Sequence, residues 1–420
     1  MKTLNFLVLI CLAACAVESS GGAYQLNGSG GFRFGYGWLE PIDLQTQIDI
    51  AVAQGGGCVK VPKGRWLSDP IELKSNVELH LSAGCELFFT DERRKYLPSV
   101  PTTYEGIECR NYRSPIFASG ATNVAITGAG KIEPQMGLWE TWRWTGPGTR
   151  NAKAVLANWG DRDVPVKDRD LTKLPDAKTR PPFVSFNGCR DVRLEGFTLR
   201  NSPFWCVHLL NCERVTVRGL SVSAFLNNSD GLDIECTRDV LVEDCSFDQG
   251  DDVIVLKSGK DRDGRRRARP TENVTIRRCR AGSGHGFLVV GSECSGGVRN
   301  VTMEDCLVDG SLDTLFKVKT TPKRGGFVKD IAVRRVKART IISSVVDINA
   351  AYSLNCSADG AEDVLTEIDG LVVDDVEVVE AKRRVSVVGD ARRPIRNLSV
   401  GNVVVKDCAM SDVVENAGAR

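Results

Sequence analysis

The sequence predicts an all-β, single-domain protein, a right-handed parallel β-helix with a short capping helix near its N-terminus. Three observations favour this fold. A short phrase, in which polar residues are followed by alternating apolar ones, recurs ten times along the 420 residues. β-branched residues dominate the apolar set, which favours strands over helices. The phrases themselves show a period of two and are not separated by a regular helical period.

The spacing of the phrases indicates a solenoid. It is 23 and 25 residues in the most regular part of the chain and 27, 30, 34 or 40 residues elsewhere. A constant minimum with variable excess is typical of coils that accept loops at one place. We therefore expect about ten coils between about Val59 and Val405, with strands paired in parallel and no second globular domain. The phrases begin at Ser75, Thr122, Arg190, Glu213, Arg238, Glu272, Arg299, Lys329, Asp369 and Arg396.

The ends of a solenoid expose unpaired strand edges and need covering. The stretch from Leu44 to Gln54 suits a short capping helix, because Ile48, Ala51 and Val52 would share one face. Gly and Pro turns follow it and lead into the first coil.

The cysteines argue against a metal or redox centre. There are fifteen, scattered along the chain without a CxxC pair, and only three histidines accompany them. We interpret the cysteines as small buried hydrophobic residues stacked in ladders, in preference to a set of disulfides. No metal and no cofactor is expected. The cysteines that recur with the repeat are Cys189, Cys212, Cys236, Cys245, Cys279 and Cys306.

Residues 1–20 have the features of a signal peptide followed by a short linker. Lys2 precedes an apolar run from Leu4 to Ala14 that is too short to span a bilayer. The run ends in a sequence that resembles a bacterial lipoprotein processing box, which predicts cleavage before Cys15 and lipidation of that residue. An ordinary secretory signal cut near Ala16 is the alternative.

The chain is therefore expected to be exported, as a periplasmic or cell-surface lipoprotein or as a fully secreted protein. Residues 21–420 would form the β-helix domain. Membrane contact is expected only through a lipid anchor, and the net charge of +1 gives no reason to expect nucleic acid.

One segment, Glu133 to Pro181, interrupts the repeat. It is long and polar, and it carries four of the seven tryptophans. Loops of this length are usually functional or disordered, and the clustered aromatic residues argue against disorder. We therefore expect a functional loop insertion at 133–181, whose tryptophans are Trp139, Trp142, Trp144 and Trp159.

Six reactive side chains follow successive phrases at offsets of 11 to 18 residues. Similar offsets place residues on one side of a solenoid, with coils roughly 4.8 Å apart. We therefore expect a stripe of three carboxylates, one imidazole and two ammonium groups. Its members are Asp230, Asp251, Asp252, His285, Lys317 and Lys319.

This stripe suits acid-catalysed cleavage of a glycosidic bond. Repulsion among neighbouring carboxylates should raise at least one pKa and keep one acid protonated near neutrality. Such cleavage needs one protonated acid and one ionised base. The ammonium groups would suit a carboxylate on the substrate. A solvated Asp-rich turn could explain the adjacent aspartates but not the whole stripe.

At these residues the chain resembles glycoside hydrolase family 28, the polygalacturonases. The family carries the ordered motifs Asn-Thr-Asp, Gly-Asp-Asp, Gly-His-Gly and Arg-Ile-Lys, and the resemblance runs from roughly Gln45 to the C-terminus. Ser229 replaces the family's Thr, and Lys317 replaces its Arg, a planar bidentate donor, by a point charge. The motifs read here Asn228-Ser229-Asp230, Gly250-Asp251-Asp252, Gly284-His285-Gly286 and Lys317-Val318-Lys319.

The resemblance implies a pectin-lyase-like solenoid that hydrolyses α-1,4-galacturonide linkages of pectin or polygalacturonate with inversion of the anomer. Asp251 would be the general acid, Asp230 and Asp252 would hold and activate the attacking water, and His285 would support the acid. The substrate-binding residues would be Lys317, Lys319, Asn228 and Tyr352.

The resemblance is strongest to bacterial exo-poly-α-galacturonosidases, so we expect exo action by a monomer on a pectic polysaccharide or oligogalacturonide. The tryptophans of 133–181 would either pack against a sugar ring at one end of the groove or simply anchor the insertion to the solenoid. Rival functions on the same fold are a rhamnogalacturonan or xylogalacturonan hydrolase, a pectate lyase, and a non-catalytic carbohydrate-binding or adhesin protein.

Overall fold

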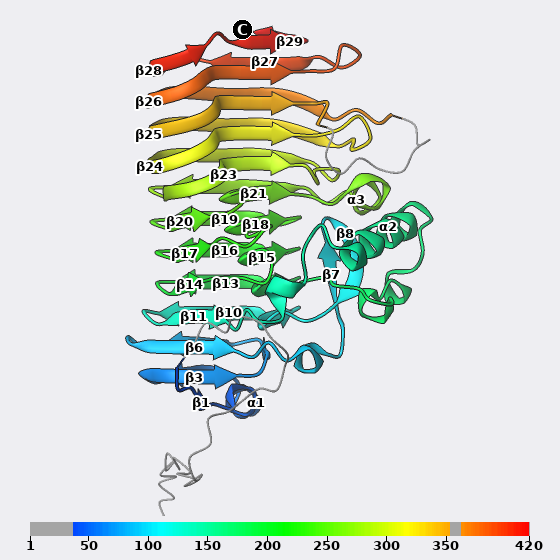
Figure 1. Cartoon of the computed structure of the whole chain (residues 1–420), viewed down its shortest axis with the longest axis vertical. Coiled ribbons are helices and arrows are strands. Elements are labelled where there is room, and N and C mark those ends of the chain that lie inside the picture. The colour runs from blue at the N-terminus through cyan, green and yellow to red at the C-terminus, as the bar shows by residue number, and fades with distance from the viewer. Residues whose placement is uncertain (1–36, 353–362, 420) are drawn as a thin grey trace, which may run out of the picture. The chain divides into compact units, whose positions relative to one another are not determined.

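The computed structural model describes residues 37–352 and 363–419. The expected signal peptide, including Cys15, lies outside these residues. Apart from one hairpin, the described strands belong to a single sheet whose pairings are parallel and which winds upward in coils, so the predicted parallel β-helix is confirmed (Figure 1). Within the described ranges, no helix is both long and apolar enough to cross a membrane.

The recurring phrases stack in register in one column of strands. Their first apolar residues pair from coil to coil, as Val192 does with Val215 and Val215 with Val240. The same alignment continues through Val274, Val301 and later coils. The column contains β2 (Gly57–Val61), β5 (Val77–Leu81), β10 (Thr122–Gly128), β13 (Arg190–Glu195), β16 (Glu213–Arg218), β19 (Arg238–Glu243), β22 (Thr271–Arg277), the start of β24 (Val298–Lys319), β25 (Phe327–Asn349) and β26 (Glu367–Val388), and then β27 (Ile395–Val400) and β30 (Ala417–Ala419).

A left-handed backbone explains why the phrase repeats. The residue just before the first apolar position has a positive φ in every phrase, for example 54° at Asp191 and 58° at Asn273. Asn, Asp and Gly reach this region most easily, and they occupy it in nine of the phrases, while Arg214 occupies it in the tenth. The polar start of the phrase therefore marks a turn of the backbone.

Two further columns complete each coil. The second contains β3 (Gly64–Ser68), β6 (Cys85–Phe89), β11 (Lys131–Pro134), β14 (Thr198–Arg200), β17 (Ser221–Ala224) and β20 (Ser246–Gln249). The third, which carries the candidate site, contains β4 (Ile71–Leu73), β9 (Ile116–Ser119), β12 (Val184–Asn187), β15 (Val207–Leu210), β18 (Leu232–Glu235) and β21 (Ile254–Lys257). From β23 (Arg280–Gly291) onward, single long strands run through what were separate strands below. Three further strands lie near the two ends of the described chain: β1 (Glu40–Pro41), β28 (Val403–Met410) and β29 (Val413–Glu415).

Apolar side chains and thiols fill the interior of the coils. The described cysteines are free thiols, and all but Cys58 and Cys408 are buried, as expected of small hydrophobic residues. At the N-terminal end, α1 (Leu44–Ala53) buries Leu44, Ile48 and Ala51 against the same core.

The predicted capping helix is confirmed with one correction. Its start is fixed by Asp43, whose side chain accepts a hydrogen bond from the backbone N–H of Thr46 at 3.0 Å. Val52, expected on the buried face, is 41% exposed. It follows Ala51 directly and so lies about 100° further round the helix.

The segment 133–181 contains more regular structure than a loop. It includes α2 (Pro147–Asp161) and short 3-10 turns at Trp139–Thr141, Val166–Asp168 and Leu171–Lys173. Beside it lies an antiparallel hairpin, β7 (Val100–Tyr104) and β8 (Ile107–Asn111), which the sequence did not reveal. Together with α3 (Asp261–Arg267), these elements lie on one side of the coils, where α2 contacts both α3 and β8 (Figure 1).

The tryptophans of this segment serve largely as anchors. Trp139 and Trp142 are buried and pack edge-to-face against each other. Trp139 also packs edge-to-face against Tyr96, and Trp142 packs against Tyr112 with the two rings tilted by 56°. Trp144 is partly buried, and its indole Nε1–H donates to Glu105 at 2.8 Å. These contacts favour the anchoring interpretation over a sugar platform.

Candidate active site

The acidic and imidazole groups of the predicted stripe lie on adjacent coils of the third column. Asp230 precedes β18, Asp251 and Asp252 precede β21, and His285 lies within β23. Backbone hydrogen bonds join these turns: the N–H of Gly231 donates to the carbonyl of Asp252 at 3.0 Å, and that of His285 to the carbonyl of Asp251 at 2.9 Å. The expected cluster of three aspartates and a histidine is therefore present.

The two lysines lie farther along the coil than the aspartates. Strand register aligns Gly286, which follows His285, with Thr314, while Lys319 is aligned with Gly291. Their offsets of 16 and 18 residues, longer than the 11 and 12 of Asp251 and Asp252, account for this displacement. Only a long side chain can bridge it, and that of Lys319 does so.

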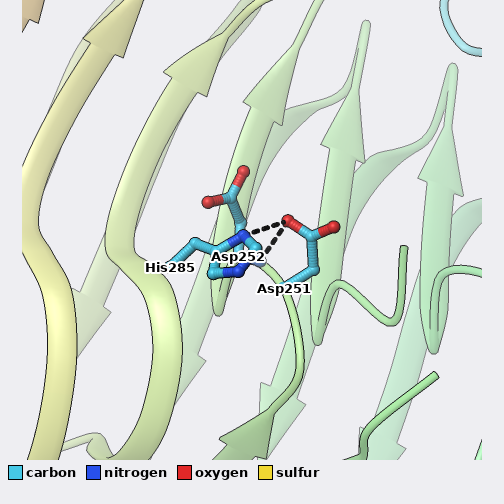
Figure 2. Close-up of side chains that lie close together, drawn as sticks. All are labelled: Asp251, Asp252 and His285. Atoms are coloured by element: carbon cyan, nitrogen blue, oxygen red, sulfur yellow. Dashed lines mark hydrogen bonds and ion pairs between the residues drawn. The ribbon is translucent and has the colours of Figure 1, made fainter. Parts of the chain in front are cut away.

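Asp251 and His285 form a hydrogen-bonded pair, with 3.0 Å between Oδ1 and Nδ1 (Figure 2). Burial alone would raise the pKa of Asp251, but the hydrogen bond and charge of His285, aided by Lys319 and Lys257, lower it below its ordinary value. The same hydrogen bond raises the pKa of His285, against the opposing effect of burial. The proton of this pair therefore lies mainly on the imidazole.

Asp252 is paired with Lys319. The ammonium Nζ lies 2.7 Å from Oδ2, and the carboxylate is almost fully buried. Oδ1 of Asp252 is buried and has no hydrogen-bond partner among the described residues. Burial would lower the pKa of Lys319, but the charge of Asp252 outweighs it and raises this pKa. The raised pKa keeps Lys319 protonated, and one carboxylate oxygen of Asp252 remains available for a small polar ligand.

Asp230 is buried in a charged environment that the sequence analysis did not include. Its Oδ2 lies 3.8 Å from Nζ of Lys257, which also lies 3.5 Å from Asp233 and 3.1 Å from Glu293. Burial first, and then the charges of Asp233 and Asp251, raise the pKa of Asp230 well above its ordinary value, although Lys257 opposes this.

One sequence signal could have revealed Lys257. Strand β21 reads Ile-Val-Leu-Lys, and all four residues are buried, so a lysine ends a strand that is otherwise wholly apolar. A buried lysine needs a counter-charge, and acidic residues on neighbouring coils were its natural partners.

The pKa values of Asp230 and Asp251 are the reverse of what the proposed roles of these residues would suggest. A raised carboxyl pKa was expected in the stripe and is present, but at Asp230, the proposed base, and not at Asp251, the proposed acid. The reason is local: His285 contacts Asp251, whereas Asp230 is more deeply buried and faces Asp233. A protonated Asp251 therefore has to arise when substrate binds or when the imidazole passes its proton back.

The remaining predicted residues surround this centre. Nζ of Lys317 lies 3.9 Å from Asp347 on the next coil, and Nζ of Lys319 lies 5.8 Å from the ring centre of Tyr352. Asn228 has a left-handed φ of 63°, and its Oδ1 accepts a hydrogen bond from buried Arg180 at 3.2 Å. Asn228 thus holds the turn that presents Asp230, and Arg180 joins this turn to the segment 133–181.

Asp251, Asp252 and His285 each have one atom that could bind a metal ion, a carboxylate oxygen or an imidazole nitrogen, and these three atoms lie within 4.8 Å of one another. Two of these groups already have cationic neighbours, because Lys319 faces Asp252 and a protonated His285 faces Asp251. The cluster is therefore charge-compensated by side chains of the chain itself.

Comparisons with known proteins agree on one family. Residues 58–419 match the model of the glycosyl hydrolases family 28. A probable polygalacturonase of Vitis vinifera is 29% identical over 307 residues, which is 71% of this chain and 57% of the relative. An exo-poly-α-D-galacturonosidase of Dickeya chrysanthemi is 25% identical over 347 residues, 76% of this chain and 55% of the relative.

Among solved structures, a hyperthermoactive exopolygalacturonase from Thermotoga maritima is 33% identical, with a TM-score of 0.82. The alignment covers 89% of this chain and 84% of that protein. The chain spans little more than half the length of the two curated relatives named above.

Proposed function

The chain belongs to family 28 of the glycosyl hydrolases, and we propose on this basis that it hydrolyses α-1,4-galacturonide linkages of pectin or polygalacturonate. The observation that carries the proposal is the grouping of Asp230, Asp252 and the Asp251–His285 pair on adjacent coils. This grouping provides both a proton donor and carboxylates for a water molecule.

Asp251 acts as the general acid. It gives its proton to the glycosidic oxygen as the bond between that oxygen and C1 breaks. His285, 3.0 Å away and with a raised pKa, is the store from which Asp251 regains a proton. Because the two groups interact strongly, they titrate as one pair.

Asp252 and Asp230 hold the attacking water. The buried Oδ1 of Asp252, which lacks a partner among the described residues, is a suitable acceptor for one of its protons. The water oxygen bonds to C1, and the released proton passes to one of these carboxylates. This reaction releases a saturated sugar and inverts the anomer.

Lys319 and Lys317 bind the carboxylate of the galacturonate ring. Lys319 lies between Asp252 and the ring of Tyr352, so a sugar bound beside Asp252 would meet both residues. Asn228 supports the site from the turn before Asp230.

We further propose that the enzyme acts from chain ends and is exported. The likeness to an exopolygalacturonase at 33% identity supports exo action, and so do the hairpin, α2 and α3, which stand on one side of the site-bearing column. The apolar run from Leu4 to Ala14 supports export, with a lipid anchor at Cys15 as the finer proposal.

To test the substrate and the exo action, the protein is incubated with polygalacturonate and, separately, with rhamnogalacturonan. The Asp251→Asn variant is the matched control. We expect saturated galacturonate monomer from polygalacturonate from the earliest times, with slow loss of viscosity. Rapid loss of viscosity with mixed oligomers would refute exo action. Cleavage of rhamnogalacturonan alone would refute the galacturonan specificity.

A further inference from the structure

Lys257, at the end of β21, is the most completely buried ammonium group beside the candidate site, with only 6% of its side chain exposed. Its Nζ lies 3.1 Å from Oε2 of Glu293 and 3.5 Å from Oδ1 of Asp233. It lies 3.8 Å from Oδ2 of Asp230 and 4.7 Å from the ring centre of Trp205. One cation, on the coil of β21, is thus shared by three buried carboxylates from the two adjacent coils: Asp230 and Asp233 at β18, and Glu293 after β23.

This arrangement is costly unless each charge is compensated. Glu293 is also supported by the hydroxyl of Ser292, which donates to Oε1 at 3.0 Å. Both carboxylate oxygens of Asp233 lack a hydrogen-bond partner among the described residues. Lys257 is therefore the principal compensating group for Asp230 and Asp233.

We propose that Lys257 is a positioning residue for the hydrolytic reaction: its ammonium holds the Asp230 carboxylate in place and favours its ionised form. The proposal rests on the proposed function, in which an ionised Asp230 helps to activate water. Without the ammonium, Asp230 would face other carboxylates in a buried site and would keep its proton to a higher pH.

The charges around these two groups all bear on this equilibrium. Asp233 on β18 and the Asp251–Asp252 turn before β21 favour protonation of Asp230, whereas Lys257 opposes it. Around Lys257, the negative groups are Glu293, Asp233, Asp230 and Asp252. Lys257 is the cation that contacts Asp230 among the described ion pairs, so its removal has the simplest expected effect.

The experiment measures kcat on polygalacturonate against pH for the full chain and for Lys257→Met. Methionine keeps the length of the side chain beside Trp205 and removes the charge. We expect the acidic limb of the kcat profile to shift to higher pH by about one unit or more, because loss of the ammonium raises the pKa of Asp230. At a pH below the limb, each unit of pKa lowers the ionised fraction of Asp230 about tenfold. Activity would recover largely at higher pH.

Lys260→Met is the matched control. Lys260 is also buried and lies three residues away, but no described ion pair joins it to Asp230. We expect its acidic limb to coincide with that of the parent. A purely structural role of Lys257 would instead lower activity by the same factor at every pH.

A second variant keeps the proposal testable if Lys257→Met does not fold. Lys257→Met with Glu293→Gln removes one ammonium and one carboxylate together, and the glutamine Oε1 can still accept from Ser292. We expect this double variant to fold and to keep the displaced limb. If the single or the double variant folds and its acidic limb lies at the same pH as that of the parent, the proposal is overturned. The hydrolase function still stands in that case, provided that the parent is active. An inactive parent would overturn the hydrolase function itself.

Discussion

Nζ of Lys319 lies 2.7 Å from Oδ2 of Asp252, so the lysine expected to bind substrate is already paired with a buried carboxylate. The sequence alone suggests that replacing Lys319 should weaken substrate binding far more than stability, because its partner would lie on the substrate. The pair corrects this expectation. Without Lys319, the Asp252 charge would remain buried and uncompensated.

We therefore predict that Lys319→Ala loses both stability and activity. Breaking a buried ion pair from one side costs about 3 kcal/mol, measurable by chemical unfolding. Lys319→Ala with Asp252→Asn should regain most of the stability and remain inactive. Parent-like stability of the single variant would show that the pair contributes nothing to the fold.

The roles of Asp251 and Asp230 can be separated with an aryl galacturonide whose leaving group needs no protonation. On polygalacturonate, Asp251→Asn should lower kcat by about 10²–10⁴-fold, since an amide cannot donate the proton. On the aryl substrate, this variant should regain much of its rate, whereas Asp230→Asn should not, because attack by water still needs the carboxylate. If Asp230→Asn regained its rate on the aryl substrate and Asp251→Asn did not, Asp230 would be the acid and Asp251 the base. That result would agree with the raised pKa of Asp230.

The Asp251–His285 pair should contribute to stability only within a pH window. The folded pKa of His285 is raised, so its contribution is complete below about pH 6.5 and is lost as pH rises through the folded pKa. The folded pKa of Asp251 is lowered, so its contribution is present above about pH 3.9 and is lost as pH falls through the folded pKa.

We therefore expect His285→Gln to lower the unfolding temperature more at about pH 5.5 than at about pH 8.5. The same substitution in an Asp251→Asn background should lack this pH dependence, because the partner charge is gone. Equal destabilisation of the parent background at both pH values would mean that the pair is not charged in the folded protein.

The product anomer tests the geometry of attack. Inverting glycosidases hold their two carboxyl groups about 6.5–9.5 Å apart, which leaves room for water. Asp251 and Asp252 each direct one oxygen to within 4.8 Å of the other, so the proposed inversion relies on Asp230 as a second carboxylate for the water. Proton magnetic resonance at early times should show the inverted anomer, and a retained anomer would exclude direct attack by water.

The coils and the motif residues could be read from the sequence, because both depend on local patterns. The polar residue with positive φ marks each turn, and alternation after Val192 or Val240 marks each strand. The hairpin β7–β8 could not be predicted in this way, and neither could the identity of the particular carboxylates that contact Lys257. They depend on contacts between residues far apart in the chain, such as the 2.7 Å hydrogen bond from Thr103 to Glu235.

The sequence also could not predict that the pKa of Asp230 is raised while that of Asp251 is lowered. This difference depends on the 3.0 Å contact between His285 and Asp251 and on the burial of Asp230, and neither quantity follows from spacing along the chain. Spacing placed Lys319 on the correct side of the solenoid, but its pairing with Asp252 depends on how far its side chain reaches.

The chemistry of the product formed from polygalacturonate tests the central claim most directly. The protein and its Asp251→Asn variant are incubated with the polymer, with and without a chelator, and reducing ends and ultraviolet absorbance are followed together. We predict new reducing ends without absorbance from unsaturated uronides, insensitivity to the chelator, and a rate about 10²–10⁴-fold lower with the variant. Products that absorb in the ultraviolet and disappear with the chelator would show an eliminating lyase and would contradict hydrolysis.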